Sequence, residues 1–286
     1  MSGNFSDKIE ELIKKHRKKI LFGSLLIATV FAALLFEMKI STGEDDASYI
    51  LAAQNFIDNE AFPTWHGSFY PIFLSFFLSI FGLNLFVFKA VSFVMIIMHI
   101  YVIYFAFRMR VPWILLLGTI IYTSVCLEIL YFAGQTYSEA LYLLLQISTL
   151  AAFFLLYDKE KENPNKIFKH WKEWLVLGFL MFLMTITRNI GWSIVIAAVI
   201  YFAVQKKFRQ IFATIATLAI FHIPYNIYKY KFWAEKNLGI EGQFERIFWV
   251  NPYNKTVGTE NFSGFISRFL ENSQLYLSKH LPMVLA

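Results

Sequence analysis

The sequence contains few charged residues and a single cysteine. Only 16% of its 286 residues are charged, whereas about a quarter are charged in an average soluble domain. The lone Cys126 excludes a disulfide framework and a cysteine-based metal site. No cleavable signal peptide is evident, because residues 1–19 are polar and basic and no small-residue cleavage site follows the first apolar run. These features exclude an ordinary soluble domain and a disulfide-rich secreted protein.

The sequence is rich in long hydrophobic runs. Hydrophobic residues make up 57% of the chain, and Phe alone occurs 32 times. The net charge of +6 does not indicate nucleic-acid binding, because the basic residues lie in short clusters between apolar runs. Such clusters are typical of cytoplasmic loops in membrane proteins. We therefore expect an all-α polytopic membrane protein, with membrane lipid as a partner and no nucleic acid.

The apolar runs predict the spans. A membrane-spanning helix needs roughly 20 apolar residues, and seven segments approach that length: 20–38, 85–107, 112–132, 137–157, 174–188, 190–204 and 211–229. Residues 69–82 form a run of about 14 residues, which suits a re-entrant or interfacial helix better than a span. Residues 281–286 are typical of the start of a further, truncated span. The prediction is seven transmembrane helices with juxtamembrane helices in the first outer loop.

The basic clusters predict which ends of the expected spans lie on the same side of the membrane. If residues 69–82 do not cross, all four clusters lie on the cytoplasmic side: Lys14–Lys19, Arg108 with Arg110, Lys159–Lys172 and Lys206–Arg209. The N-terminus is then cytoplasmic, and residues 1–19 form an amphipathic interfacial helix. The expected domains are this helix, a transmembrane module over residues 20–229 and an extracytoplasmic segment over residues 230–280.

Adjacent acids follow the first apolar run. Asp45 and Asp46 precede apolar residues at helical spacing, beginning with Tyr49, so an amphipathic helix is expected along the membrane surface. The two acids then suit the helix dipole and cap free N–H groups. Two adjacent acids exceed what one cap needs, so a carboxylate directed into a cavity is the alternative, either as a general base or as a metal ligand.

Further polar residues fall on the same predicted face. Arg188 ends one apolar run and either snorkels to lipid phosphate or grips a ligand phosphate through its guanidinium. Lys89 is an interfacial anchor or a second phosphate contact. Glu139, close after Gln135, is a helix-start carboxylate or a polar residue of a cavity.

Sugar transfer from a lipid-linked phosphate requires this set of groups. A cation must neutralise the departing phosphate, a carboxylate must take the proton of the acceptor, and an apolar groove must hold the polyprenyl chain. Arg188 supplies the cation, and Asp45 or Asp46 supplies the base. Direct attack opposite the leaving group predicts inversion at the anomeric carbon.

The order of motifs resembles the GT-C superfamily of polyprenyl-phosphate-sugar glycosyltransferases. The resemblance is to the branch of bacterial protein O-mannosyltransferase-like and aminoarabinose transferase-like enzymes, and it covers roughly residues 15–230. The motifs that carry it are Asp45-Asp46-Ala-Ser-Tyr49, Tyr70-Pro71 through Phe81-Gly82, Lys89 near the start of a span, and Thr187-Arg188-Asn-Ile-Gly191 at an outer turn.

The resemblance implies roles for individual residues. Asp45 matches the catalytic Asp, Asp46 the acid that follows it, and Arg188 a donor-phosphate contact. The family's Lys-Pro-Pro motif is replaced here by a segment that begins at His66, which is the stand-in for the missing lysine. Tyr49, Glu139 and Gln135 are the expected polar residues of the cavity.

The resemblance also implies a location in the bacterial inner membrane and sets the expected partners. These are a polyprenyl-phosphate sugar and an acceptor that is a protein, a glycolipid or a polysaccharide, with no cofactor and no predicted metal. The alternatives are a polytopic transporter or lipid flippase, which favours mid-membrane charges and inverted repeats, and a non-catalytic membrane scaffold of the same fold.

Overall fold

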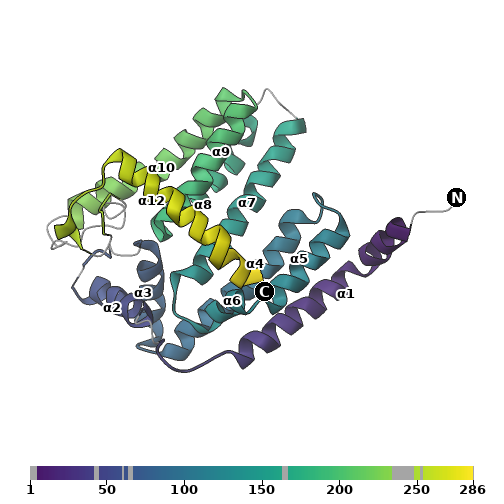
Figure 1. Cartoon of the computed structure of the whole chain (residues 1–286), viewed down its shortest axis with the longest axis horizontal. Coiled ribbons are helices and arrows are strands. Elements are labelled where there is room, and N and C mark those ends of the chain that lie inside the picture. The colour runs from purple at the N-terminus through teal and green to yellow at the C-terminus, as the bar shows by residue number, and fades with distance from the viewer. Residues whose placement is uncertain are drawn as a thin grey trace. The chain divides into compact units, whose positions relative to one another are not determined.

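The chain is helical throughout its described parts. The computed structural model (Figure 1) describes residues 5–41, 45–59, 61–63, 67–162, 167–233, 248–251 and 254–285. Within these residues, helices account for the regular structure except for one isolated antiparallel bridge between Trp249 and Thr259. The chain divides into two compact units, the first comprising residues 1–63 and 67–237 and the second residues 64–66 and 238–286.

Unit 1 contains the long apolar helices together with several shorter ones. They are α1 (Phe5–Leu34), α2 (Asp45–Asp58), α3 (Phe69–Phe81), α4 (Leu85–Phe107), α5 (Trp113–Val125), α6 (Leu127–Tyr131), α7 (Ser138–Glu162), α8 (Trp171–Thr187), α9 (Trp192–Val204) and α10 (Phe208–Trp233). The described part of unit 2 contains α12 (Phe262–Leu275), a π-helical turn (Tyr276–His280) and α13 (Leu281–Leu285). A single helix, α1, covers most of residues 1–19 and continues into the first expected span.

The prediction of seven spans is wrong. By length and composition, three described helices are able to cross a membrane: Leu85–Phe107, Ser138–Lys161 and Phe208–Lys231. A fourth is obtained if Trp113–Val125 and Leu127–Gly134, which meet at a bend of 49°, count as one span. The expected helix at residues 112–132 is therefore interrupted, because Cys126 adopts extended backbone between its two halves.

The remaining expected spans form helices that are too short. The uncharged part of α1 lies between Lys19 and Leu34, where the helix ends. The helix α8 has 17 residues and ends before Arg188, whose backbone is extended at φ −149° and ψ 142°. Helix α9 and its preceding turn cover only Asn189–Val204. Apolar composition alone does not show where a helix breaks, so the span lengths that we predicted from the sequence were too long.

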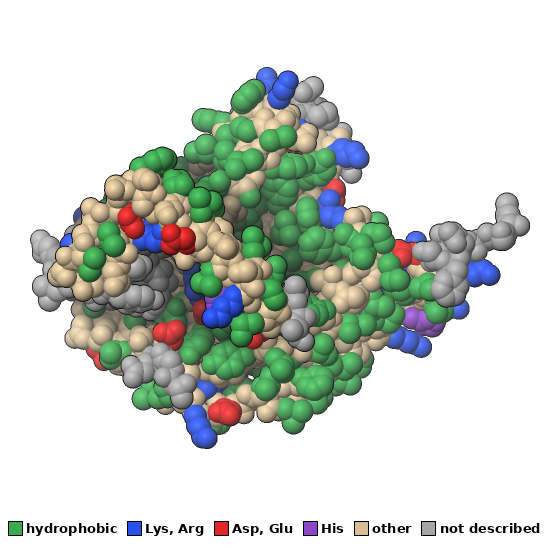
Figure 2. Space-filling model, in the orientation of Figure 1, with side chains coloured by type: hydrophobic (Ala, Val, Ile, Leu, Met, Phe, Trp, Pro, Cys, Tyr) green, Lys and Arg blue, Asp and Glu red, His purple; other side chains and the backbone are tan. Residues whose placement is uncertain are grey.

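Two apolar cores hold unit 1 together. In the larger core, α4 packs against α7 through residues such as Ile96 and Ile100, which are fully buried. The smaller core lies where α8 packs between α7 and α10, around the buried Trp174. Large apolar side chains are also exposed, as at Phe22 and Phe212, and Figure 2 shows hydrophobic side chains over much of the visible surface. This distribution fits helices that face lipid, because a bilayer solvates apolar surface.

Contacts within or next to the four basic clusters lie at one end of unit 1. They are the hydrogen bond from the Trp113 amide to Glu10 (2.6 Å), the ion pair of Arg110 with Asp158 (2.5 Å), the ion pair of Lys159 with Glu173, and the hydrogen bond from Gln210 to Glu160 (3.4 Å). These contacts join the first half of α1, the α4–α5 connection, the end of α7 and the starts of α8 and α10. The four clusters are therefore near one another at one end of unit 1, which we call the basic end.

Candidate functional site

The start of α2 lies at the other end of unit 1 and carries the two adjacent acids. Both lie in the first turn of the helix, where carboxylates interact favourably with the positive end of the helix dipole. Their environments differ, because the Asp45 side chain is exposed whereas Asp46 is completely buried. Only Asp45 is therefore open to a substrate.

Three partners from different elements hold the buried Asp46 carboxylate. Its Oδ1 accepts a hydrogen bond from the Thr136 amide at 2.6 Å, and its Oδ2 accepts one from the Ser41 amide at 3.0 Å. The ammonium of Lys89, on α4, lies 3.8 Å from Oδ2. A buried charge is costly unless it is paired and hydrogen-bonded, and this environment meets both conditions.

Lys89 is as deeply buried as its partner, with 1% of its side chain exposed. Its ammonium also donates a hydrogen bond to the Lys39 carbonyl at 2.5 Å. Lys89 and Asp46 therefore tie the segment after α1, the start of α2, α4 and the turn before α7 to one another. In this arrangement the Lys89 ammonium faces protein groups and not an open cavity.

A second polar group surrounds Ser138, at the start of α7. Its Oγ hydrogen-bonds the Tyr49 hydroxyl at 2.8 Å and accepts a hydrogen bond from Arg188 Nη1 at 3.2 Å. The same guanidinium forms an ion pair with Glu139. The side chains of Arg188 and Glu139 are 35% and 28% exposed, so both are accessible to a ligand.

The charged side chains of Asp45, Glu139 and Arg188 all influence the ionisation of Tyr49. Burial raises the pKa of the Tyr49 phenol to about 12, and the negative charges of Glu139 and Asp45 add to this shift. The hydrogen bond with Ser138 and the positive charge of Arg188 oppose it. The phenol is therefore protonated at neutral pH and can donate or accept a hydrogen bond. Asp45 and Arg188 both lie within electrostatic reach of Tyr49, which brings the predicted base and the predicted phosphate contact together.

The turn before α7 carries unsatisfied polar atoms. Among the residues that the structure describes, the buried Gln135 Oε1 and Thr136 Oγ1 have no hydrogen-bond partner. Such groups are uncommon in native structures and call for an explanation such as a bound water or ligand. Gln135 was a predicted cavity residue, whereas sequence reasoning missed Ser41, Thr136 and Ser138 because small polar residues in turns are common.

The segment before α3 passes very close to the end of α8. Gly67 has φ +97°, and a Cβ built on it would lie 2.1 Å from the Thr187 carbonyl oxygen, next to Arg188. Only glycine allows both this conformation and this approach. His66, the predicted stand-in for a phosphate-binding lysine, lies outside the described residues.

We expect Gly67→Ala to destabilise the protein and to displace Arg188. Alanine at φ +97° costs of order 1–3 kcal/mol, and the collision with Thr187 adds to that cost. Thermal unfolding of the purified protein measures the loss. Gly82→Ala is the control, because Gly82 has φ +64° but open space around it. Equal losses in the two variants would contradict a role for the close approach.

In the part of the chain that the structure describes, no three His, Cys, Asp or Glu side chains are grouped so that they could hold a metal ion. Comparisons of the chain with protein-family models, with curated proteins and with solved structures found no match.

Proposed function

We propose that the chain is an integral-membrane inverting glycosyltransferase that moves a sugar from a polyprenyl-phosphate donor to an acceptor on the extracytoplasmic face. The observation that carries the proposal is the convergence of an exposed carboxylate, Asp45, and an accessible guanidinium, Arg188, around Tyr49 and Ser138. These are the base and the cation that transfer from a phosphate requires.

The position of the site along α7 supports a membrane-bound donor. Glu139 starts this helix, and Asp158, at the basic end, lies 19 residues further on. At 1.5 Å per residue the two are about 29 Å apart, which is close to the roughly 30 Å thickness of the hydrocarbon core. Basic loops favour the cytoplasmic side, so the polar site lies at the extracytoplasmic interface, where a lipid-linked head group is presented.

The proposed reaction is a single displacement. Asp45 takes the proton from the acceptor hydroxyl or amine as that atom attacks the anomeric carbon from the side opposite the phosphate. The bond from the anomeric carbon to the phosphate oxygen breaks, and its electron pair leaves with the polyprenyl phosphate. The Arg188 guanidinium, which has five N–H donors, binds this phosphate while Asp46 and Lys89 hold the start of α2 in place.

The direct test is transfer from labelled polyprenyl-phosphate sugars in membranes that contain the full chain. The expected result is labelled product from at least one sugar, with inverted anomeric configuration. Donor that binds but is never transferred would contradict the proposal and favour a non-catalytic scaffold. Donor that crosses sealed vesicles without reacting would favour a lipid flippase.

Arg188→Gln should weaken donor binding by at least about tenfold, because a charge-assisted hydrogen bond to phosphate is worth roughly 1.5–3 kcal/mol. Titration of membranes with labelled donor measures this loss. Glu139→Gln is the matched control, since it releases the guanidinium from its ion pair and should leave donor binding unchanged or tighter. Equal weakening in both variants would mean that the ion pair is structural and that Arg188 does not contact the phosphate.

A further inference from the structure

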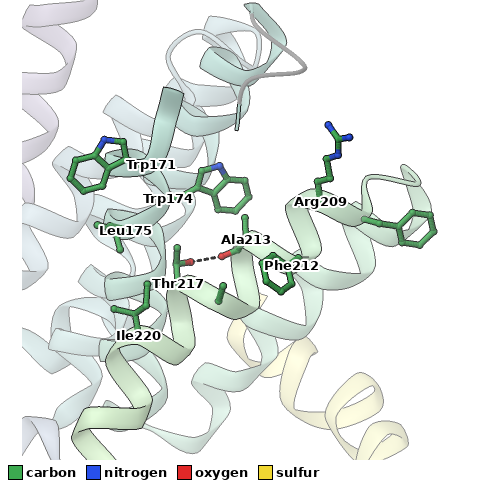
Figure 3. A pocket seen from close by; sticks show the side chains of 10 residues that line it. Trp171, Trp174, Leu175, Arg209, Phe212, Ala213, Thr217 and Ile220 are labelled. Carbon is green, nitrogen blue, oxygen red and sulfur yellow. Dashed lines mark hydrogen bonds between the residues drawn. The ribbon is translucent and has the colours of Figure 1, made fainter. Parts of the chain in front are cut away.

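A large apolar groove lies between α8 and α10 at the basic end, away from Asp45. Its volume is about 720 Å³, and Trp171 and Trp174 on α8 line it together with Phe212 and Ile220 on α10. Figure 3 shows these side chains around the groove. The proposed sugar transfer does not use it.

The groove lies beside a close contact between α8 and α10. At the point of contact, a Cβ built on Gly178 would lie 2.7 Å from the Thr217 side chain, so the helices meet without room for a larger residue. The two helices also pack against each other further along, as at Phe182 and Phe221. The lining on α10 includes the small Ala213 and Ala216 between the larger Phe212 and Ile220. The hydroxyl group of Thr217 does not offer its proton to a ligand in the groove, because it donates a hydrogen bond to the Ala213 carbonyl at 2.7 Å.

The dimensions of the groove match one leaflet of a bilayer. Its lining on α10 extends from Phe208 to Ile220, and these 12 steps of helix span about 18 Å. Half of a hydrocarbon core of roughly 30 Å is about 15 Å. Trp171, which is 53% exposed, lies at the same end as Arg209, and tryptophan is enriched at membrane interfaces.

A cation stands at the mouth of the groove. Arg209 is exposed, and within the described chain its guanidinium forms no hydrogen bond or ion pair. Lys206 and Lys207 precede it at the start of α10. Basic residues at a cytoplasmic membrane surface attract anionic lipids, and each contributes about 1 kcal/mol.

We propose that the groove binds one anionic glycerophospholipid, with an acyl chain along Ala213 and Ala216 and its phosphate at Arg209. The tail of the sugar donor is a poorer fit, because its phosphate belongs near Arg188. That residue follows the last turn of α8, whereas the groove begins at Trp171, 17 residues earlier and about 25 Å away along the helix. The proposal therefore does not rest on sugar transfer.

Native mass spectrometry of the delipidated full chain tests the proposal. The probes are phosphatidylglycerol and phosphatidylcholine with identical acyl chains. Wild type should prefer phosphatidylglycerol, and Arg209→Gln should weaken its binding about fivefold, to the level of phosphatidylcholine. Ala216→Trp should weaken both lipids by filling the groove. Arg108→Gln is the control, because Arg108 is an exposed arginine that does not line the groove.

Three results would overturn the proposal. The first is equal binding of the two lipids by wild type, and the second is unchanged phosphatidylglycerol binding in Arg209→Gln. The third is one-for-one displacement of phosphatidylglycerol by polyprenyl phosphate, which would assign the groove to the donor. If Ala216→Trp does not fold, the ratio of the two lipids in Arg209→Gln decides the question alone.

Discussion

Asp45→Asn should lower the rate of sugar transfer by about 10²- to 10⁴-fold and leave donor binding unchanged. The magnitude is that of losing a general base, and asparagine keeps the size of the side chain but cannot accept the acceptor's proton. Because Asp45 is exposed and Asp46 carries the packing contacts of this turn, the substitution should not alter the fold. Single-turnover transfer from labelled donor measures the chemical step.

Asp58→Asn is the matched control for this experiment. Asp58 is an exposed aspartate in the last turn of the same helix, α2, so its replacement removes an equal charge without removing the proposed base. The Asp58→Asn variant should transfer sugar at the wild-type rate. Full activity in Asp45→Asn would remove Asp45 from the mechanism and direct attention to Glu139, the other accessible carboxylate near Tyr49.

Lys89→Met should destabilise the protein by about 3–5 kcal/mol, because it leaves the Asp46 carboxylate buried without its countercharge. Chemical denaturation in detergent measures the change in the free energy of unfolding. Asp46→Asn should also destabilise, and the double variant should lose less than the sum of the two single losses, because neither charge is then left unpaired.

Lys159→Met provides the comparison for this pair. Lys159 forms an ion pair with Glu173, but its side chain is 49% exposed, so water compensates for the loss and the change should stay within about 1 kcal/mol. Strictly additive losses at Lys89 and Asp46 would show that the two residues act independently. Sugar transfer by a folded Lys89 variant would further separate a positioning role from direct contact with phosphate.

Part of the candidate site could be predicted from the sequence. Charges next to apolar runs pointed to Asp45, Asp46, Arg188 and Glu139, because each is costly at that depth of a membrane. The same reasoning could not separate Asp45 from Asp46, since neighbours in a helix carry similar patterns but face different surroundings. Their difference in burial arises from Thr136, which is 90 positions away in the chain. The pairing of Arg188 with Glu139 is also a contact between distant segments.

The sequence by itself determined that the chain is helical and apolar, and its charge pattern placed the four basic clusters together. Both properties follow from local composition and from the cost of burying charge. Only the tertiary structure decided how many helices are long enough to cross, because breaks at Cys126 and Arg188 depend on backbone conformation. It also decided that Asp46 pairs with Lys89 and that a groove opens between α8 and α10. Those features arise from packing between segments far apart in the chain, which no local pattern encodes.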